Sequence, residues 1–533
     1  MSVHVEESEW DGTHFSREES TGVVLGLDFG QVGFLGVGVV IAVTLVIAFG
    51  FPVGFIGAVA VAGVFGVIGI PRYDGRSLLR WAWVFISMWF RKKQGQNQFV
   101  QETDTIDATV DDAGEIVIQP TYKSVDGDSG EDIPRDKKGR IKPPVGQRMK
   151  LPGEFNELQM FQLPGGAAFV YDPRRREAMV SARILTEKAF HLEDSNRVED
   201  RLRAWAAAQT AVAQIPGVVR LQCSDQTTII SGTKVLEWYE SRQGREGEST
   251  GADVNPFLDQ SFVELMNQAE GQPVHELWMT VVLGQEPLKK RIQANGGRLR
   301  GFMETALSIM GVIEAAIPDS GARVMGWHTP RSMAALIRSA FDPRSSVEIS
   351  SRRGDREGVA VSAAGPMHAS WDVNRFESDG ALHRTFKISE WPQSQAQLGF
   401  LDRLVFAGDF RHTVSVYIRP RDTRKAFKDV ERRKADWETN DKLRRKAGRQ
   451  QSLRHDRQLE DIEREETELV VGHAALKIAC LITVSALSEQ ELEANSGDVR
   501  TRAAEAGCEV RSMDGEQDAA FVAGATPLGR LMI

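Results

Sequence analysis

The chain is poor in cysteine and lacks the motifs of the common nucleotide-dependent and metal-dependent enzymes. Its three cysteines among 533 residues, Cys223, Cys480 and Cys508, are far apart. This spacing excludes a disulfide framework and the paired ligands of zinc or haem sites, and it indicates buried thiols in a reducing compartment. No window contains the phosphate-binding pattern G-x-x-x-x-G-K-[ST] or a G-x-S-x-G elbow. We therefore predict that the protein is not an enzyme and has no catalytic residue, cofactor or metal ligand.

Charge is missing from one long stretch near the N-terminus. Residues 32–70 contain no charged side chain, and Gly50, Pro52 and Gly54 interrupt the run near its middle. One helix of this length would measure about 58 Å, whereas the hydrocarbon core of a bilayer is about 30 Å thick. We predict a transmembrane hairpin that turns at these three residues. Six glycines are expected to let its two helices pack closely: Gly33, Gly36, Gly38, Gly57, Gly63 and Gly66.

Two other interpretations of this stretch remain open. A cleavable signal peptide normally begins with basic residues, but the first 31 residues hold seven acids against Arg17 alone. A hairpin in a soluble core would show polar positions at helical spacing, and the run has almost none apart from Thr44.

Basic residues after the hairpin predict its orientation. Positive charge is retained on the cytoplasmic side, so the body and the acidic tail, residues 1–31, are expected in the cytoplasm of a two-pass cell-membrane protein. Residues 81–90 are too short to cross but rich in aromatics, and we predict that residues 71–100 form an interfacial helix. If this helix crossed instead, the topology would invert. The predicted interfacial anchors are Trp81, Trp83, Trp89, Arg91, Lys92 and Lys93.

Beyond the hairpin the sequence becomes polar and divides into segments. Residues 101–149 are rich in Asp, Lys, Gly and Pro and are predicted to be a flexible linker that tethers the body to the membrane. Residues 150–423 predict an α+β body, residues 424–470 a charged helical arm, and residues 471–533 a C-terminal αβ segment. The expected fold is a membrane α-hairpin followed by an α+β cytoplasmic body with a long charged helix.

Local patterns predict several elements of the body. The runs 167–171 and 177–185 read as two strands of a hairpin, because Asp172 and Pro173 are typical turn residues. Apolar spacing predicts helices over 197–214, 255–268 and 297–316.

The arm carries most of the clustered charge. Thirteen Lys or Arg face six acids from Arg424 to Arg457, and six acids then face Arg464 alone from Glu460 to Glu468. We expect one long helix, or a helical pair broken near Gly448, that docks a protein partner or a neighbouring copy. The predicted docking residues are Arg432, Arg433, Lys434, Arg444, Arg445 and Lys446.

Nucleic-acid binding is the rival interpretation of the arm, since clustered cations neutralise phosphates. Acids interleaved at helical spacing favour an ordinary solvated helix instead. The formal net charge of −9 also excludes a chain that is basic throughout.

Short motifs along the chain resemble parts of type IV secretion and conjugation systems. The hairpin followed by Tyr73-Asp74-Gly75-Arg76, an aromatic helix and Gln98-Phe99 is similar to the PrgI-like inner-membrane subunit. Residues 167–174, 200–205, 218–222 and 364–366 and the closing Pro527-Leu528-Gly529-Arg530 resemble the N-terminal, non-ATPase part of the VirB-type conjugation ATPase. In this order, the chain resembles actinobacterial conjugation proteins that combine both parts.

The resemblance implies an inner-membrane scaffold in a machine for DNA transfer. A separate conjugation ATPase would supply the motor, because the nucleotide-binding motifs of that family are missing here. Other secretion-machine subunits, membrane lipid and further copies of the chain are the implied partners, and nucleic acid is not expected as a direct one. The alternatives are a membrane-tethered nucleic-acid-binding protein and a membrane-associated enzyme of unfamiliar type.

Overall fold

A computed structural model describes most of the hairpin, the body and the arm. The described residues are 29–73, 76–101, 109–110, 116–117, 146–186, 195–229, 257, 261, 264, 273–317, 322–352, 354, 357–392, 399–446, 453–471 and 475–531. Most of the predicted acidic tail, most of the predicted linker and most of the predicted helix at 255–268 lie outside them.

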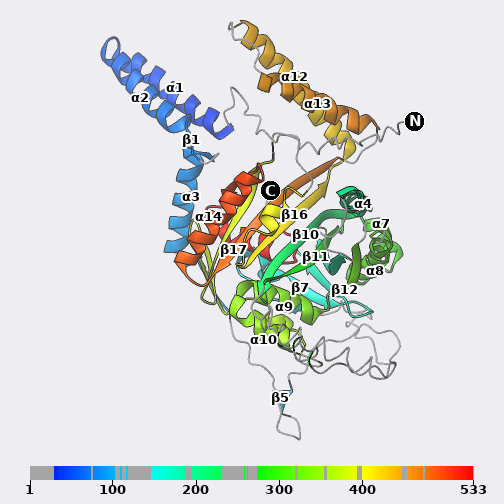
Figure 1. Ribbon diagram of the computed structural model, residues 1–533. Coiled ribbons are helices and arrows are strands. Elements are labelled where there is room, and N and C mark those ends of the chain that lie inside the picture. Colours follow the sequence, from blue (N-terminus) through cyan, green and yellow to red (C-terminus); the bar gives the residue numbers. More distant parts are fainter. Residues whose placement is uncertain are drawn as a thin grey trace, which may run out of the picture.

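One antiparallel sheet forms the centre of the body (Figure 1). Its strands follow in the order β3 (Gln98–Val100), β13 (His368–Trp371), β14 (Phe376–Ser378), β15 (Ala381–Glu390), β17 (Leu476–Ala486), β16 (His412–Pro420), β10 (Val218–Ile229), β11 (Pro273–Gly284), β9 (Glu177–Thr186), β8 (Ala168–Asp172), β7 (Gln159–Gln162) and β6 (Gln147–Arg148). In addition, β12 (Ala322–Trp327) pairs with β9, and β18 (Glu509–Ser512) pairs with β15. The α+β class predicted for the body is therefore correct.

Helices cover both faces of this sheet, because alternate strand residues point to opposite sides. On one face lie α4 (Ser195–Gln214), α7 (Lys289–Ala294), α8 (Arg298–Ala316), α11 (Asp402–Val405) and α14 (Glu489–Glu505). There the rings of Phe169 and Phe302 meet edge to face, with centroids 5.5 Å apart. On the other face lie α9 (Pro330–Phe341), α10 (Ser346–Ser351) and α15 (Gln517–Ala525).

The C-terminal segment completes the body and is not a separate unit. Strand β17 lies between β15 and β16 and pairs with both over most of its length. Its side chains Leu481 and Ile482 belong to cores on opposite faces of the sheet. The predicted boundary at residue 471 therefore marks the end of the arm, and the segment after it belongs to the same sheet as the body before it.

The predicted role of residues 101–149 as a tether is wrong. Strand β3 precedes this segment and already pairs with β13 at one end of the sheet, whereas β6 follows it at the opposite end. The segment therefore leaves the sheet at one edge and returns at the other. Within it, β4 (Thr109–Val110) and β5 (Ile116–Val117) pair with each other. The N-terminal apolar hairpin connects to the body ahead of this segment, through residues 71–97.

Candidate membrane and docking surfaces

The N-terminal apolar run folds into two packed helices, α1 (Phe29–Phe49) and α2 (Val53–Gly69). The turn between them lies at Gly50, Phe51 and Pro52, and Gly50 has a positive φ of 63°. Gly50 and Pro52 are at the turn as predicted, whereas the third predicted turn residue, Gly54, lies in the first turn of α2. At the open end, the amide of the buried Gln31 donates a hydrogen bond of 2.6 Å to the carbonyl oxygen of Gly69. The pairing of the two helices is thus fixed at both ends.

Two glycines account for the closest approach of α1 and α2. A Cβ at Gly54 would lie 2.6 Å from the carbonyl oxygen of Leu45, and a Cβ at Gly38 would lie 2.6 Å from the ring of Phe65. At Gly33, Gly36 and Gly63, by contrast, a Cβ would meet no described atom within 4 Å. The prediction that six glycines serve helix packing is therefore wrong for these three, and also for Gly66, where a Cβ would meet only the side chain of Ile70 at the end of the same helix.

One described helical segment, Gly30–Phe49, is long and apolar enough to cross a membrane. Helix α2 has 17 residues, which corresponds to about 26 Å against a hydrocarbon core of about 30 Å. Large apolar side chains point outward from both helices, and Ile47, for example, is 80% exposed. Such a surface is unfavourable in water and suits a lipid environment.

The aromatic segment forms α3 (Leu78–Lys93), with the Ser77 hydroxyl capping its first turn. The predicted range 71–100 is too long for this helix, because β1 (Arg72–Tyr73) and β2 (Arg76–Ser77) pair before it and β3 follows it. One side of α3 packs on the body, since Met88 is buried in the core and a Cβ at Gly515 would lie 2.5 Å from Val84. The opposite side is apolar and exposed, including Trp83 at 70% and Trp89 at 58%.

The predicted anchors lie along α3 but do not all share its exposed side. Trp81 is half-buried and stacks on Phe85, whereas Trp83 and Trp89 are exposed together with the basic residues of the last turn. The Lys93 ammonium lies 5.3 Å from the centre of the Trp89 ring. Aromatic rings next to cations are typical of side chains at the headgroup level of a membrane. The three exposed cations are Arg91, Lys92 and Lys93.

The charged arm is a helical pair, α12 (Thr423–Lys446) and α13 (Leu453–Val471), with residues 447–452 outside the described residues. Helix α12 carries ten Lys or Arg against five acids, and α13 carries seven acids against three Lys or Arg. The two helices fold back on each other around a small apolar core that contains Val430 and Ile462. The sequence is compatible with one long helix or a helical pair, and the structure has the pair.

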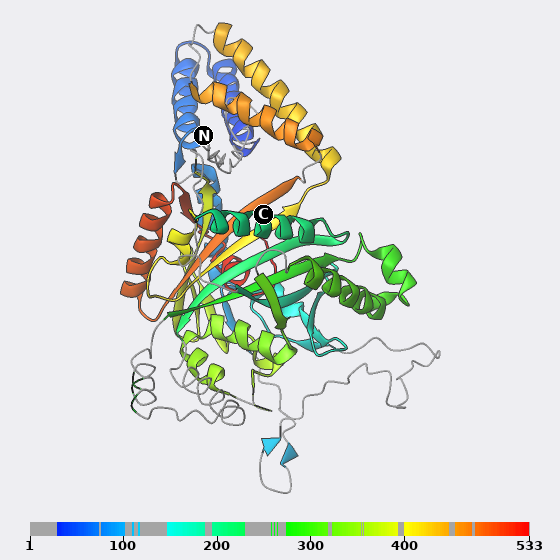
Figure 2. The same ribbon diagram turned by 45° about the vertical axis from the view of Figure 1, so that its right-hand side comes forward.

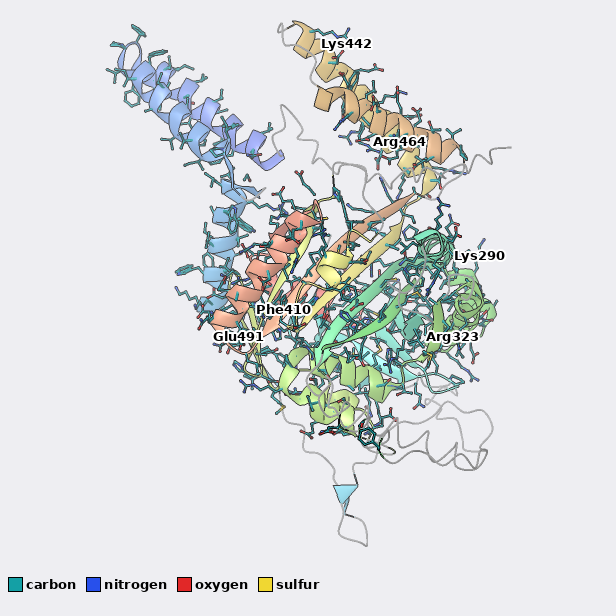
Figure 3. The ribbon with its side chains drawn as sticks, in the orientation of Figure 1. Lys290, Arg323, Phe410, Lys442, Arg464 and Glu491 are labelled. Carbon is teal, nitrogen blue, oxygen red and sulfur yellow. The ribbon has the colours of Figure 1, made fainter. Side chains whose placement is uncertain are left out.

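Folding back brings opposite charges together within the chain. Arg433 pairs with Glu465 at 2.6 Å, and Lys434 pairs with Glu466 at 2.8 Å. These two predicted docking residues are therefore occupied by intramolecular ion pairs. Figure 3 labels Lys442 and Arg464, one on each helix of the arm, and both are exposed.

The other predicted docking residues differ in their surroundings. The Arg432 side chain is 81% exposed and lies only 4.0 Å from the Asp436 carboxylate on the same helix. Arg445 pairs with Asp441 at 2.8 Å. Arg444 and Lys446 lie on α12, but their side chains are outside the described residues. In both views the arm extends from the same end of the body as the hairpin (Figures 1 and 2).

Several motifs that carry the resemblance meet in space, at a cluster that we call the tail clasp (Asp172, Arg220, Gln222, Gly529 and Arg530). The Arg530 guanidinium is 2% exposed and pairs with the Asp172 carboxylate. The Gly529 amide donates to Gln222 Oε1 over 2.7 Å, and Arg220 Nε donates to the Gly529 carbonyl oxygen over 3.0 Å. Burial lowers the pKa of Arg530, and Asp172 opposes this shift. The clasp holds the C-terminal segment to β8 and β10.

The histidines and cysteines form no metal-ligand cluster in the part of the chain that the structure describes, although His383 contacts the hydroxyls of Ser378 and Ser485. Among these residues no three His, Cys, Asp or Glu side chains are grouped as metal ligands would be. His275 Nδ1 lies 2.7 Å from Asp225 Oδ1, but no hydrogen bond links the imidazole to a described serine or cysteine. Burial raises the pKa of the Cys223 thiol to about 12 and that of Cys508 to about 11, so neither is a ready nucleophile.

Comparisons of the chain with protein-family models and with curated proteins find no match.

Proposed function

We propose that the protein is an inner-membrane scaffold subunit of a type IV secretion or conjugative transfer machine that docks a separate ATPase. The observation that supports this most is the direct joint between an apolar helical hairpin and a large folded body. An enzyme needs a reactive site, whereas a scaffold needs an anchor, a stiff body and surfaces for partners.

The proposed topology has two crossings, with the bulk of the chain in the cytoplasm. Helix α2 reaches across the bilayer with modest local thinning, which membranes tolerate at a cost of fractions of a kcal/mol per Å. The exposed cations at the end of α3 favour the cytoplasmic side. On this proposal, the outward aromatic side of α3 contacts lipid headgroups.

The proposed docking surface for the ATPase is the arm. Its surface carries charges of both signs and is not uniformly basic. Its internal ion pairs withdraw cations such as Arg433 and Lys434 from external phosphates. This supports a protein partner over nucleic acid, since nucleic-acid affinity comes mainly from unpaired cations. Exposed charges of both signs, such as Arg432 and Glu468, remain to match a partner.

Single cysteines in the full chain test the anchor, with labelling by a membrane-impermeant maleimide. Phe51→Cys at the hairpin turn should be labelled in intact cells, whereas Lys93→Cys at the end of α3 should be labelled only after lysis. The unsubstituted chain is the control, because Cys480 and Cys508 are buried and Cys223 is half-buried. Labelling of Lys93→Cys in intact cells would contradict the proposed orientation.

Co-purification tests the partner. The full chain in detergent should retain a conjugation ATPase expressed from the same host, and charge reversal at Arg432 and Glu468 together should weaken this association. Retention of DNA in place of the ATPase, with an affinity that falls steeply with salt, would favour the nucleic-acid alternative.

A further inference from the structure

A cavity of about 770 Å³ lies between the sheet and the helices α9 and α10. Residues of β10 and β11 form one side, α9 and α10 form the other, and β12 and Arg411 complete the lining. Its volume is within the range of sites that hold small ligands, about 300–1,000 Å³. Nothing in the proposed scaffold role uses this cavity.

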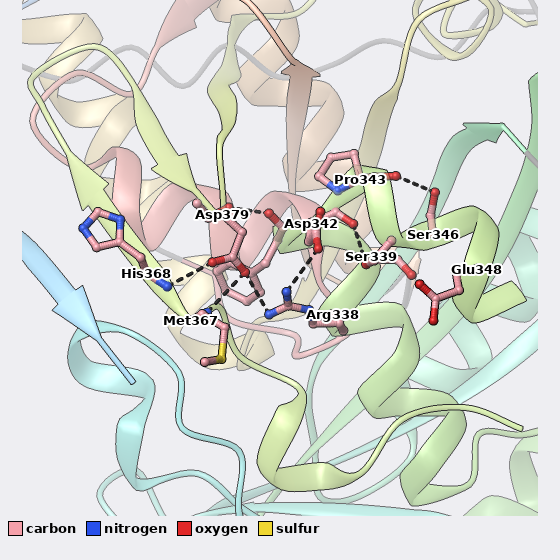
Figure 4. A network of polar contacts seen from close by, with 12 residues as sticks. Arg338, Ser339, Asp342, Pro343, Ser346, Glu348, Met367, His368 and Asp379 are labelled. Carbon is pink, nitrogen blue, oxygen red and sulfur yellow. Dashed lines mark hydrogen bonds and ion pairs between the residues drawn. The ribbon is translucent and has the colours of Figure 1, made fainter. Parts of the chain in front are cut away.

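The helical wall of the cavity is held in place by a polar network (Figure 4). Arg338 on α9 pairs with Asp342 at 3.1 Å and with Asp379 at 2.8 Å, and it also donates to the Gly365 carbonyl oxygen over 2.8 Å. The next residue, Ser339, lines the cavity. The wall is therefore preformed, which lowers the entropy lost on binding.

The surroundings of Arg411 differ from those of Arg338, although both side chains are largely shielded from water. Its guanidinium donates to Thr228 Oγ1 over 3.0 Å and to the Ser339 carbonyl oxygen over 2.7 Å, both neutral acceptors. No ion pair joins it to a carboxylate among the residues that the structure describes. Burial lowers the pKa of Arg411 to about 10, so the group remains charged at neutral pH. Glu276 and Asp342 attract the charge from beyond ion-pair distance and offset part of the cost of its burial. An anion in direct contact with the guanidinium would offset more of that cost.

Two ring nitrogens at the cavity also lack partners. Trp278 is 3% exposed, and its Nε1–H has no hydrogen-bond acceptor in the described part of the chain. His328 Nε2 is likewise buried without a described partner. The Ser332 hydroxyl donates to the Thr329 carbonyl oxygen, so its contact with His328 Nδ1 is one in which the ring donates. His328 Nε2 is then an acceptor, and burial lowers the pKa of His328 to about 4, which keeps the ring neutral.

We propose that this cavity binds a small hydroxylated organic anion, either a phosphate monoester or a hydroxy acid. The anionic group pairs with Arg411, a ligand oxygen accepts from Trp278 Nε1–H, and a ligand hydroxyl donates to His328 Nε2. Among the described residues, three arginines and two glutamates line the cavity, which suits a ligand of one or two negative charges better than a polyanion. The three arginines are Arg183, Arg352 and Arg411, and the glutamates are Glu276 and Glu357.

Isothermal titration of the full chain in detergent micelles tests the proposal, with glycerol 3-phosphate and malate as probes. At least one probe should bind saturably, and the tighter one identifies the anionic group. Arg411→Met should weaken binding about tenfold to a hundredfold, because a hydrogen bond to a charged group contributes about 1.5–3 kcal/mol. Arg419→Met is the matched control, since Arg419 is exposed on β16 and does not line the cavity.

A second measurement separates ligand binding from a structural role of Arg411. If the guanidinium serves the ligand, Arg411→Met leaves the melting temperature of the ligand-free chain unchanged or raises it, while the ligand-induced rise is lost. Trp278→Phe keeps a ring but removes the indole N–H, and it should weaken binding severalfold. The proposal is overturned if neither probe binds at millimolar concentration, or if Arg411→Met binds as tightly as Arg419→Met.

Discussion

Neutralising Asp172 in the tail clasp should destabilise the body strongly. The substitution Asp172→Asn keeps an oxygen that can accept from the backbone N–H groups of Arg174 and Arg175, which now donate to Asp172 Oδ1 over 2.9 and 3.1 Å. It replaces the oxygen that accepts from Arg530 with an amide NH2 group, so the charge and the hydrogen bond that face Arg530 are lost together. The perturbation therefore isolates the ion pair from the turn that Asp172 also stabilises.

The magnitude follows from what remains around Arg530. Removing one partner of a buried ion pair costs about 3–5 kcal/mol, because the other charge stays buried and unpaired. Glu154 lies 3.9 Å from the guanidinium but is itself largely solvated, so it compensates only in part. We expect Asp172→Asn to lower the free energy of unfolding by about 3 kcal/mol. Arg530→Met should cost less, because Asp172 keeps its two backbone donors.

A double-mutant cycle on the full chain in detergent micelles provides the assay, with unfolding followed by tryptophan fluorescence in urea. The double variant Asp172→Asn with Arg530→Met should be more stable than Asp172→Asn alone, since no unpaired charge remains. If the two single effects add within about 0.5 kcal/mol, the pair is not coupled and the reasoning is refuted.

Three further predictions concern the linker, the arm and a buried histidine. Proteolysis within residues 118–145 should not separate the body from the apolar hairpin, because β3 already joins the hairpin to the sheet; a body that is freed from the hairpin after cleavage would contradict this. Glu465→Lys should increase hydrogen exchange in α12 and α13, and adding Arg433→Glu should restore protection, whereas equal exchange in both variants would mean that the pair is unimportant. Burial lowers the pKa of His383 to about 3, below its value of about 6.5 in the unfolded chain. Its neutral ring therefore contributes stability above pH about 6.5 that is lost as the pH falls towards 3. In His383→Gln, the free energy of unfolding, measured between these pH values, should fall less steeply with decreasing pH.

Local elements could be predicted from the sequence because their signals are contained in a few consecutive residues. The predicted runs 167–171 and 177–185 correspond to β8 and β9, and the predicted helix 297–316 corresponds to α8. Turn residues and apolar spacing suffice for such elements. The position of the hairpin turn was predictable for the same reason.

Long-range pairing could not be predicted in this way. Strand β3 has three residues, and its partner β13 lies more than 250 positions along the chain, so nothing near Phe99 indicates that it belongs to the sheet. Without that pairing, residues 101–149 read as a tether. Tertiary contacts also determine that β17 lies between two strands of the body and that the arm folds back on itself. They likewise bring the residues that line the cavity together around Arg411.

The joint between α3 and β3 has a mechanical consequence. Only Gln94, Gly95, Gln96 and Asn97 separate the helix from the strand. Asn97 and Trp371 exchange hydrogen bonds, with Trp371 N–H donating to the Asn97 carbonyl oxygen over 3.1 Å and Asn97 Nδ2 donating to the Trp371 carbonyl oxygen over 3.4 Å. Because this connection is short and hydrogen-bonded, we expect a tilt of the hairpin relative to the body to be transmitted to the edge of the sheet. The hairpin and the edge strand would then change orientation together.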